Sequence, residues 1–295
     1  MMYSVQTYGY LDLVEGVRQL GGKYPFLSAH VIGQSVMEKP IIALRCGTGP
    51  RLIHMNGSIH ANEWITSALL MRFVGDLSAA YYSGEKLCGQ HVDQLCSEVT
   101  LWAVPMVNPD GVELSQRGVP QSHPWYPQLL EWNGGSDQFS GWKGNIRGVD
   151  LNDQFPAHWE EECKRRGITS PGPRDYPGPY PLSEPEALTM ARFTEALPFA
   201  AVIALHTQGR EIYWNYRDYE PAEAEGMARR LGQASGYQPV KLTGSDAGYK
   251  DWFIQHFRRP GFTVEAGYGE NPLPMAQFDR IYVELQPLLL EALKL

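Results

Sequence analysis

One segment in the first third of the chain constrains the fold most. A strand-like apolar run, Leu52–Asn56, passes through the small-residue turn GSIHANE into a helix-like segment, Asn62–Tyr82. A strand that leads directly into a helix is typical of layered α/β folds. The turn carries His60 and, three positions later at the first turn of the expected helix, Glu63. This spacing lets an imidazole nitrogen and a carboxylate converge on one point.

The alternation of strand-like and helix-like segments continues along the chain, which predicts a single α/β domain spanning residues 1–295. The expected strands are His30–Val36, Ile41–Cys46, Leu52–Asn56, Val99–Val104, Ala200–His206, Ile212–Asn215 and Phe262–Glu265. The expected helices are Tyr10–Gly22, Asn62–Tyr82, Glu184–Leu197, Ala222–Ser235 and Met275–Leu293.

Composition and charge argue against several kinds of partner. The chain has 295 residues, 43% of them hydrophobic, and a formal net charge of -8. The acidic balance argues against nucleic acid, because phosphate contacts need clustered Lys and Arg. No apolar stretch reaches the roughly 20 residues that cross a bilayer, and the N-terminus lacks the pattern of a secretory signal. We expect a cytoplasmic protein that binds neither nucleic acid nor membrane, although a leader or wall-binding module outside this chain would leave no trace in it.

The four cysteines are expected to be unpaired, mostly buried thiols. Cys46, Cys88, Cys96 and Cys163 form no CxxC pair. A disulfide between Cys88 and Cys96 is the alternative.

Two irregular stretches, residues 113–145 and 167–182, are too long to be plain connections. Long ordered loops often carry binding surfaces. The aromatic residues in them are therefore expected to wall a substrate site, with exposed loop packing as an equal alternative; they are Trp125, Trp132, Tyr176 and Tyr180. A linker is the alternative for residues 167–182.

A second histidine completes a possible metal site. His206 ends the apolar run AAVIALH, at an expected strand end. Two histidines and one glutamate form a known catalytic zinc set that leaves a fourth position open. Taken alone, the HxxE spacing of His60 and Glu63 is weak evidence, because this spacing also occurs by chance. A glutamate at a helix start is also favoured by the helix dipole.

Two further carboxylates fit supporting roles. Asp150, in GVDLN, is the candidate partner for the second ring nitrogen of a zinc-bound histidine; an ordinary turn aspartate is the alternative. Glu265 ends the apolar strand GFTVE and is the candidate general base, separate from the ligands. An ordinary strand-end glutamate is the alternative for Glu265.

Together these residues resemble the zinc metallocarboxypeptidase family. The matching segments are HANEW, VNPDGVE, NIRGVDLN, ALHTQG and TVEAG, in the family's order and across nearly the whole chain. The resemblance implies an α/β fold with a mixed central sheet of about eight strands. It also implies one zinc ion held by His60, Glu63 and His206, with Asp150 behind His60 and Glu265 as general base.

One branch of the family is more similar: the γ-D-glutamyl-meso-diaminopimelate peptidases, which act on bacterial peptidoglycan stem peptides. The similar phrases are WKGNIRGVDLNDQFP, PRDYPGPYPLSEPEA, LHTQGREIYW, GYKDWFIQHFRRPGFTVE and NPLPMAQFDRIY. The resemblance implies hydrolysis of the bond between γ-D-glutamate and diaminopimelate or lysine.

The chain departs from the family where substrate is held. Typical members have Asn-Arg where this chain has Asn152-Asp153, and that arginine binds the substrate's terminal carboxylate. We therefore hypothesise that Asp153 binds the ammonium of the diamino acid; a surface-facing aspartate is the alternative. Further candidate substrate contacts are Asn152, Thr207 and Tyr249, although Tyr249 is out of register with the family's substrate-capping tyrosine, where this chain has Thr243.

The cation that stabilises the oxyanion is ambiguous in the sequence. The family has an arginine directly after a tryptophan, and this chain has Lys143 after Trp142, with Arg147 four positions later. We favour Arg147, because its guanidinium can also bind a substrate carboxylate. Two rival functions remain: an ordinary carboxypeptidase acting on α-linked peptides, and a catalytically silent protein that binds stem peptides.

Overall fold

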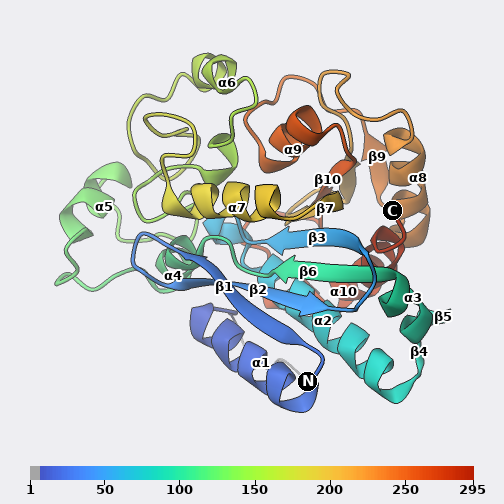
Figure 1. Ribbon diagram of the computed structural model, residues 1–295. Coiled ribbons are helices and arrows are strands. Elements are labelled where there is room, and N and C mark those ends of the chain that lie inside the picture. Colours follow the sequence, from blue (N-terminus) through green and yellow to red (C-terminus); the bar gives the residue numbers. More distant parts are fainter. Residues whose placement is uncertain (1–6) are drawn as a thin grey trace.

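An eight-stranded mixed sheet runs through the middle of this computed structural model, which describes residues 7–295 (Figure 1). The strand order is β1-β2-β6-β3-β7-β10-β8-β9. The strands are β1 (Ser28–Gln34), β2 (Pro40–Cys46), β3 (Arg51–Gly57), β6 (Val99–Val104), β7 (Phe199–His206), β8 (Glu211–Tyr213), β9 (Gln238–Val240) and β10 (Gly261–Glu265). A separate two-stranded ribbon consists of β4 (Lys86–Leu87) and β5 (Gln90–His91).

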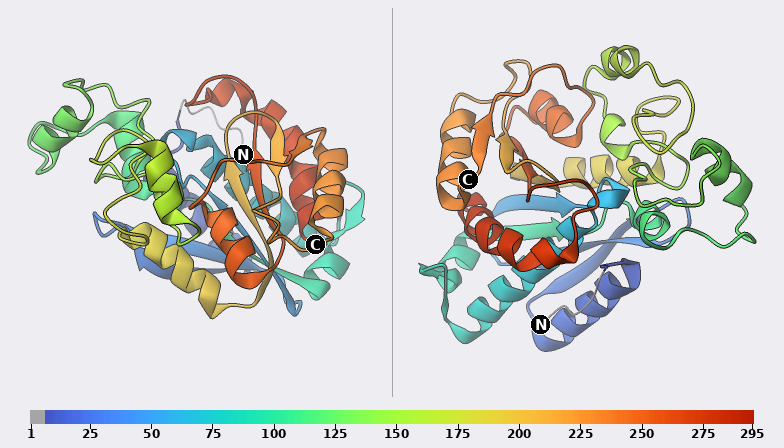
Figure 2. Two further views of the ribbon diagram at one scale, coloured as in Figure 1. Left: turned by 90° about the horizontal axis from the view of Figure 1, so that it is seen from above. Right: turned by 180° about the vertical axis from the view of Figure 1, so that it is seen from behind.

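Helices cover both faces of the sheet, which gives three layers (Figure 2). One face packs against α1 (Tyr10–Lys23), α2 (Ile65–Ser83), α8 (Ala224–Ser235) and α10 (Phe278–Ala292). The other face packs against α7 (Pro185–Ala196) and α9 (Tyr249–Phe257). The remaining helices are α3 (Val92–Glu98), α4 (Pro109–Arg117), α5 (Tyr126–Trp132) and α6 (Trp159–Arg166), with 3-10 turns η1 (Ala61–Glu63), η2 (Leu151–Asp153) and η3 (Met275–Gln277).

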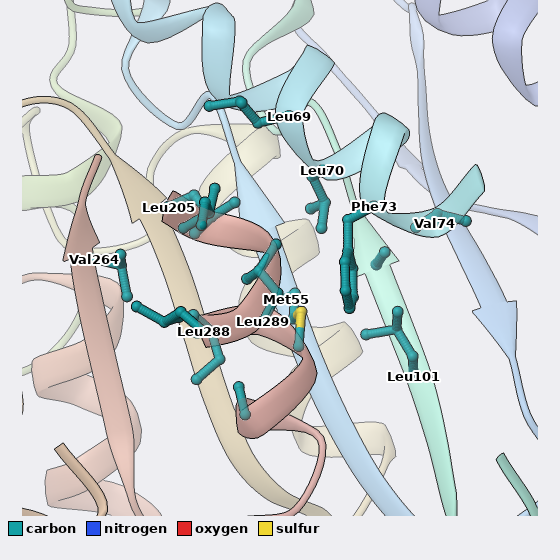
Figure 3. Packing of buried hydrophobic residues seen from close by; sticks show 14 of the residues in the cluster. Met55, Leu69, Leu70, Phe73, Val74, Leu101, Leu205, Val264, Leu288 and Leu289 are labelled. Atoms are coloured by element: carbon teal, nitrogen blue, oxygen red, sulfur yellow. The ribbon is translucent and has the colours of Figure 1, made fainter. Parts of the chain in front are cut away.

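The central strands are apolar on both faces because both faces are covered. In β7, Ala201, Ile203 and Leu205 face one core cluster while Val202 and Ala204 face the other. This is the two-residue period of a strand, and continuous apolar runs are typical of parallel strands buried on both sides. Figure 3 shows the first cluster, in which side chains of α2 and α10 meet residues of the sheet.

The predicted fold class is confirmed. All seven expected strands form within two residues of their predicted ends, and all five expected helices form within three. The sequence patterns missed three short strands (β4, β5 and β9) and five short helices (α3, α4, α5, α6 and α9). Of these, β9 has only three residues, and α4, α5 and α6 lie in or beside the stretches that interrupt the alternation.

All four cysteines are free, so the alternative disulfide between Cys88 and Cys96 is wrong. Cys88 is exposed, whereas Cys96 is buried. None of the helices in the described part of the chain has the length and apolar character that spanning a membrane requires.

The aromatic residues of the first irregular stretch pack locally. Trp125 and Trp132 lie with their ring centroids 6.1 Å apart and pack against a small apolar cluster around Leu129 and Phe139. In the second stretch, Tyr180 is exposed. The two tryptophans therefore pack within their own loop, which is the alternative given for them above.

A buried asparagine holds two loops together near the sheet edge. Asn108 begins α4, and its side-chain oxygen accepts from the amide of Gly111. Its side-chain nitrogen donates to the carbonyls of Ile59 and Gly144, at 3.2 and 3.1 Å. A Cβ atom on Gly111 would lie 2.6 Å from Asn108 and from the carbonyl of Gly144, so only glycine fits there. The VNPDG segment therefore fixes the loop that carries His60 against the loop that carries Lys143.

We predict that Asn108→Ala lowers the free energy of unfolding by about 3 kcal/mol, because three buried backbone groups lose their partner. Asn108→Asp should be at least as harmful, since its carboxylate would face two carbonyl oxygens. Asn133→Ala is the control, because Asn133 makes two similar bonds at the exposed end of α5 and should cost less than about 1 kcal/mol. Denaturant unfolding measures all three, and equal losses for Asn108→Ala and Asn133→Ala would contradict the assignment.

Candidate metal centre and active site

Three neighbouring parallel strands bring the chemically important residues to one edge of the sheet. β3, β7 and β10 are adjacent and parallel. His206 is the last residue of β7, Glu265 is the last of β10, and their Cα atoms are paired in register. His60 follows the end of β3 by three residues. Ligands bind at the carboxyl ends of such strands, so this edge is the candidate active site.

Two imidazoles and one carboxylate converge there. The Nδ1 atoms of His60 and His206 lie 3.1 Å apart. Glu63 reaches both, with Oε1 2.8 Å from His60 Nδ1 and Oε2 3.0 Å from His206 Nδ1. All three residues are buried, and their ligand atoms form a group that could hold a metal ion. This nitrogen and carboxylate set fits zinc and leaves a coordination position open for catalysis.

The charges around the group favour a cation. Burial alone would lower the pKa of His60, but the carboxylates of Glu63 and Asp150 outweigh burial and raise this pKa to about 9. In the same way the two imidazoles lower the pKa of Glu63, against the effect of burial. Burial lowers the pKa of His206. The carboxylates thus create a negative potential at the point where the three side chains meet. A divalent cation bound there would neutralise it.

Two polar partners hold Glu63, the buried Thr207 and the half-buried Asn271. The backbone amide of Thr207 donates to Oε2 at 3.2 Å, and the Asn271 side chain donates to Oε1 at 3.5 Å. The hydroxyl of Thr207 also donates a hydrogen bond to the side-chain oxygen of Asn271, at 2.7 Å. Thr207, a candidate substrate contact, is therefore engaged in holding Glu63.

Asp150 lies behind His60. Its Oδ1 is 3.3 Å from Nε2 of His60, and its Oδ2 is 3.0 Å from Nζ of Lys143. Asp150 is fully buried and begins the η2 turn, where it accepts from the amide of Asn152. A carboxylate on the far nitrogen of a histidine fixes the ring's tautomer and direction, so the other nitrogen points at the metal group.

Lys143, rather than Arg147, is the cation beside this group. Lys143 contacts Asp150. Burial alone would lower the pKa of the Lys143 amine, but the charge of Asp150 outweighs burial and raises it, so the amine stays charged. Arg147 is the more exposed of the two cations, and its guanidinium lies 3.6 Å from Glu184. The side-chain oxygen of Asn145 accepts from the amide of Arg147 in the intervening turn. These contacts favour Lys143 over Arg147 as the cation closer to the metal group.

Glu265 lies beside the metal group. Burial, and next the charge of Glu63, raise the pKa of Glu265 to about 8. His60 and Lys143 act in the opposite sense. A carboxylate with a raised pKa, separate from the metal-binding residues, has the properties of a general base.

The structure does not support two of the candidate substrate contacts. Asp153 is 3% exposed, and Arg166 of α6 covers it, with Nη2 3.0 Å from Oδ1 and Nε 2.9 Å from Oδ2. Tyr249 is fully buried under the sheet, and its hydroxyl bonds with that of Thr194 at 2.8 Å. Both side chains are therefore buried and already paired. Asn152 is half-buried and accepts from the amide of Tyr249.

A cavity of about 510 Å³ is connected to the centre through Lys143, and the sequence patterns did not identify the charged residues that line it. Arg166 and Asp175 both line it, and Asp175 also lies 3.7 Å from Nζ of Lys143. Tyr213 lines it from β8 and donates to Glu211, whose Cα is paired with that of Glu265. Two features of the sequence could have indicated these residues. They are the segment WEEECKRR, whose acidic start and basic end are typical of a helix, and the aspartate in PRDYPGPYP.

Solved structures share the fold. The chain superposes on bovine thrombin-activatable fibrinolysis inhibitor in complex with tick carboxypeptidase inhibitor with a TM-score of 0.75, at 20% identity, covering 98% of this chain and 97% of that one. It superposes on the murein-tripeptide amidase MpaA of Escherichia coli O157 with a TM-score of 0.59, at 20% identity, covering 93% and 95%. At this identity the likeness shows the architecture alone.

Sequence comparison is more specific. The chain is 48% identical over 290 residues to gamma-D-glutamyl-L-diamino acid endopeptidase 1 of Lysinibacillus sphaericus, covering 98% of this chain and 73% of the relative. It is 26% identical over 262 residues to human carboxypeptidase B2, covering 82% and 55%. A family profile described as zinc carboxypeptidase matches residues 13–286. With its sheet, its two-histidine, one-glutamate centre and these matches, the chain belongs to the zinc carboxypeptidase family of metallopeptidases.

Proposed function

We propose that this protein is a peptidase with one zinc ion per chain that hydrolyses the amide between γ-D-glutamate and the diamino acid, diaminopimelate or lysine, of peptidoglycan stem peptides. The observation that carries the proposal is the 48% identity, over almost the whole chain, to a gamma-D-glutamyl-L-diamino acid endopeptidase. The buried residues His60, Glu63 and His206, which converge on one point, support metal-dependent hydrolysis.

Each residue of the centre has a defined task in this reaction. His60, Glu63 and His206 hold the zinc, which when bound polarises the scissile carbonyl and lowers the pKa of water. The carboxylate of Glu265 takes a proton from the attacking water and later donates it to the nitrogen of the leaving diamino acid. Asp150 keeps His60 in the orientation that presents Nδ1 to the metal.

Lys143 is the proposed electrostatic partner of the developing oxyanion. Its ammonium is already held at the centre by Asp150 and is mostly buried, so its charge is poorly screened. Asn152 lies on the same turn as Asp150 and remains a proposed substrate contact. Arg147 is not part of this proposal, because it is directed toward Glu184.

Digestion of defined stem peptides tests the function directly. We predict that L-alanyl-γ-D-glutamyl-diaminopimelate is cut at the γ-glutamyl bond, and that mass spectrometry detects alanyl-glutamate and the free diamino acid. The α-linked isomer is the matched control and should stay intact. Release of the C-terminal residue from α-linked peptides alone would indicate an ordinary carboxypeptidase. Stoichiometric zinc without cleavage of any peptide would indicate a binding protein.

We predict that Lys143→Ala lowers kcat by about 100-fold with little change in KM, because a charge that stabilises the transition state contributes about 3 kcal/mol. Arg147→Ala is the matched control and should keep kcat within about twofold. Steady-state kinetics on the γ-glutamyl peptide measure both variants. The reverse result, a loss of kcat in Arg147→Ala alone, would restore the preference drawn from the sequence.

We predict that Glu265→Gln abolishes turnover while zinc still binds, since the amide cannot accept a proton. In the wild type, kcat/KM should rise with pH as Glu265 loses its proton. Because burial and Glu63 raise the pKa of Glu265 to about 8 without metal, and a bound cation lowers it, the acidic limb should fall between the ordinary pKa of 4.5 and about 8. A pH profile that stays flat down to pH 4 would exclude Glu265 as the base.

A further inference from the structure

We propose that the cavity beside the centre binds the free amino-acid head of the diamino acid, with Asp175 contacting its ammonium and Arg166 its carboxylate. This inference rests on the proposed function and names the residues that select the leaving group. It assigns to Asp175 the ammonium recognition that the sequence had suggested for Asp153.

The cavity is linked to the catalytic centre by a row of ion pairs. His60 contacts Asp150, Asp150 contacts Lys143, and Lys143 lies 3.7 Å from Asp175 on the cavity wall. Tyr213 also lines the cavity, and its hydroxyl donates to Glu211, whose Cα is paired with that of Glu265 at the strand end. The cavity wall is thus close to Lys143, the proposed partner of the oxyanion, and the proposal assigns the side chain of the leaving group to this cavity. At about 510 Å³ the cavity is in the size range of small-molecule sites.

The charges on the cavity wall complement a zwitterion. Nη1 of Arg166 and Oδ1 of Asp175 lie 3.2 Å apart, and both side chains are about one-third exposed, at 30% and 31%. A free amino-acid head carries an ammonium and a carboxylate on a single carbon atom. It can meet the arginine with its carboxylate and the aspartate with its ammonium at the same time, and charge-assisted contacts of this kind are strong and geometrically specific.

The other two charged residues that line the cavity, Arg165 and Glu162, are held by ion pairs. Arg165 forms ion pairs with Glu162 and Asp246, both buried. Glu162 also lies 2.8 Å from Nε of Arg166. Arg166 and Asp175 thus contact each other and are also both exposed to the cavity.

Asp153 is a positioning residue in this arrangement. It holds the guanidinium of Arg166 through two contacts from the buried side, which fixes the direction of the other edge. An aspartate on the same turn as Asp150 thus holds an arginine that α6 supplies.

Four γ-D-glutamyl substrates separate the two contacts. Diaminopimelate carries both distal groups, lysine only the ammonium, 2-aminopimelate only the carboxylate, and norleucine neither. We expect Asp175→Asn to lower kcat/KM by about tenfold or more for diaminopimelate and lysine, and to change it by less than about twofold for the other two. Asp218→Asn is the control, because Asp218 is an exposed aspartate paired with Lys241 and should behave as wild type on all four.

Arg166→Lys tests the second contact while keeping a positive charge against Asp153. It should lower kcat/KM by about tenfold or more only for the substrates with the distal carboxylate. Thermal unfolding checks that this variant is folded, and if it is not, Asp175→Asn decides on its own.

Two outcomes overturn the inference while wild-type cleavage keeps the proposed function. If Asp175→Asn changes none of the substrates, the residue does not contact the ammonium. If it lowers all four equally, Asp175 acts through Lys143 and not by recognition. A wild-type protein that cleaves no γ-D-glutamyl substrate would refute the function and the inference together.

Discussion

The contact of one carboxylate with two imidazoles is the interaction on which the rest of the site depends. Glu63 directs one oxygen to each of His60 and His206, which are 146 positions apart in the sequence. The sheet makes this meeting possible, because the strands that end near both histidines are neighbours and run in the same direction. Burying these groups costs solvation energy, which their polar partners offset in part, and a bound cation would offset it further.

Charges of alternating sign extend outward from this centre. Behind His60 lies Asp150, then Lys143, then Asp175 and Arg166. Each buried charge thus has an opposite neighbour, which is the condition under which buried ionic groups are tolerated. The same row joins the reacting end of a substrate to the cavity where its leaving group would lie. Catalysis and recognition therefore share one electrostatic framework in this account.

Regular periodicity explains what could be predicted from the sequence. The strand before His60, the strand that ends in His206 and the strand that ends in Glu265 are apolar runs bounded by small residues, and all three form. The parallel strand ends share one edge of the sheet, which explains why His60, His206 and Glu265 meet, whereas the sequence grouped these residues by their chemistry and by the family resemblance. The spacing of His60 and Glu63 needed only the local geometry of one turn.

Irregular backbone explains what could not be predicted. The segment from Lys143 to Asp153 has no repeating period, so the sequence could not decide which of Lys143 and Arg147 faces the centre. Asp153 could be identified as a departure from the family, but its partner, Arg166, lies on a helix that the patterns missed. Tyr249 was a candidate only by its place in a loop, and in the structure it begins a buried helix.

A crystal structure of the protein loaded with one equivalent of zinc, with data collected at the zinc absorption edge, tests the central claim most directly. The account predicts one anomalous peak per chain, within about 2.2 Å of Nδ1 of His60, Nδ1 of His206 and an oxygen of Glu63. A peak elsewhere, such as among the neighbouring carboxylates of Asp150, Asp153 and Asp175, or the absence of any peak, would contradict it.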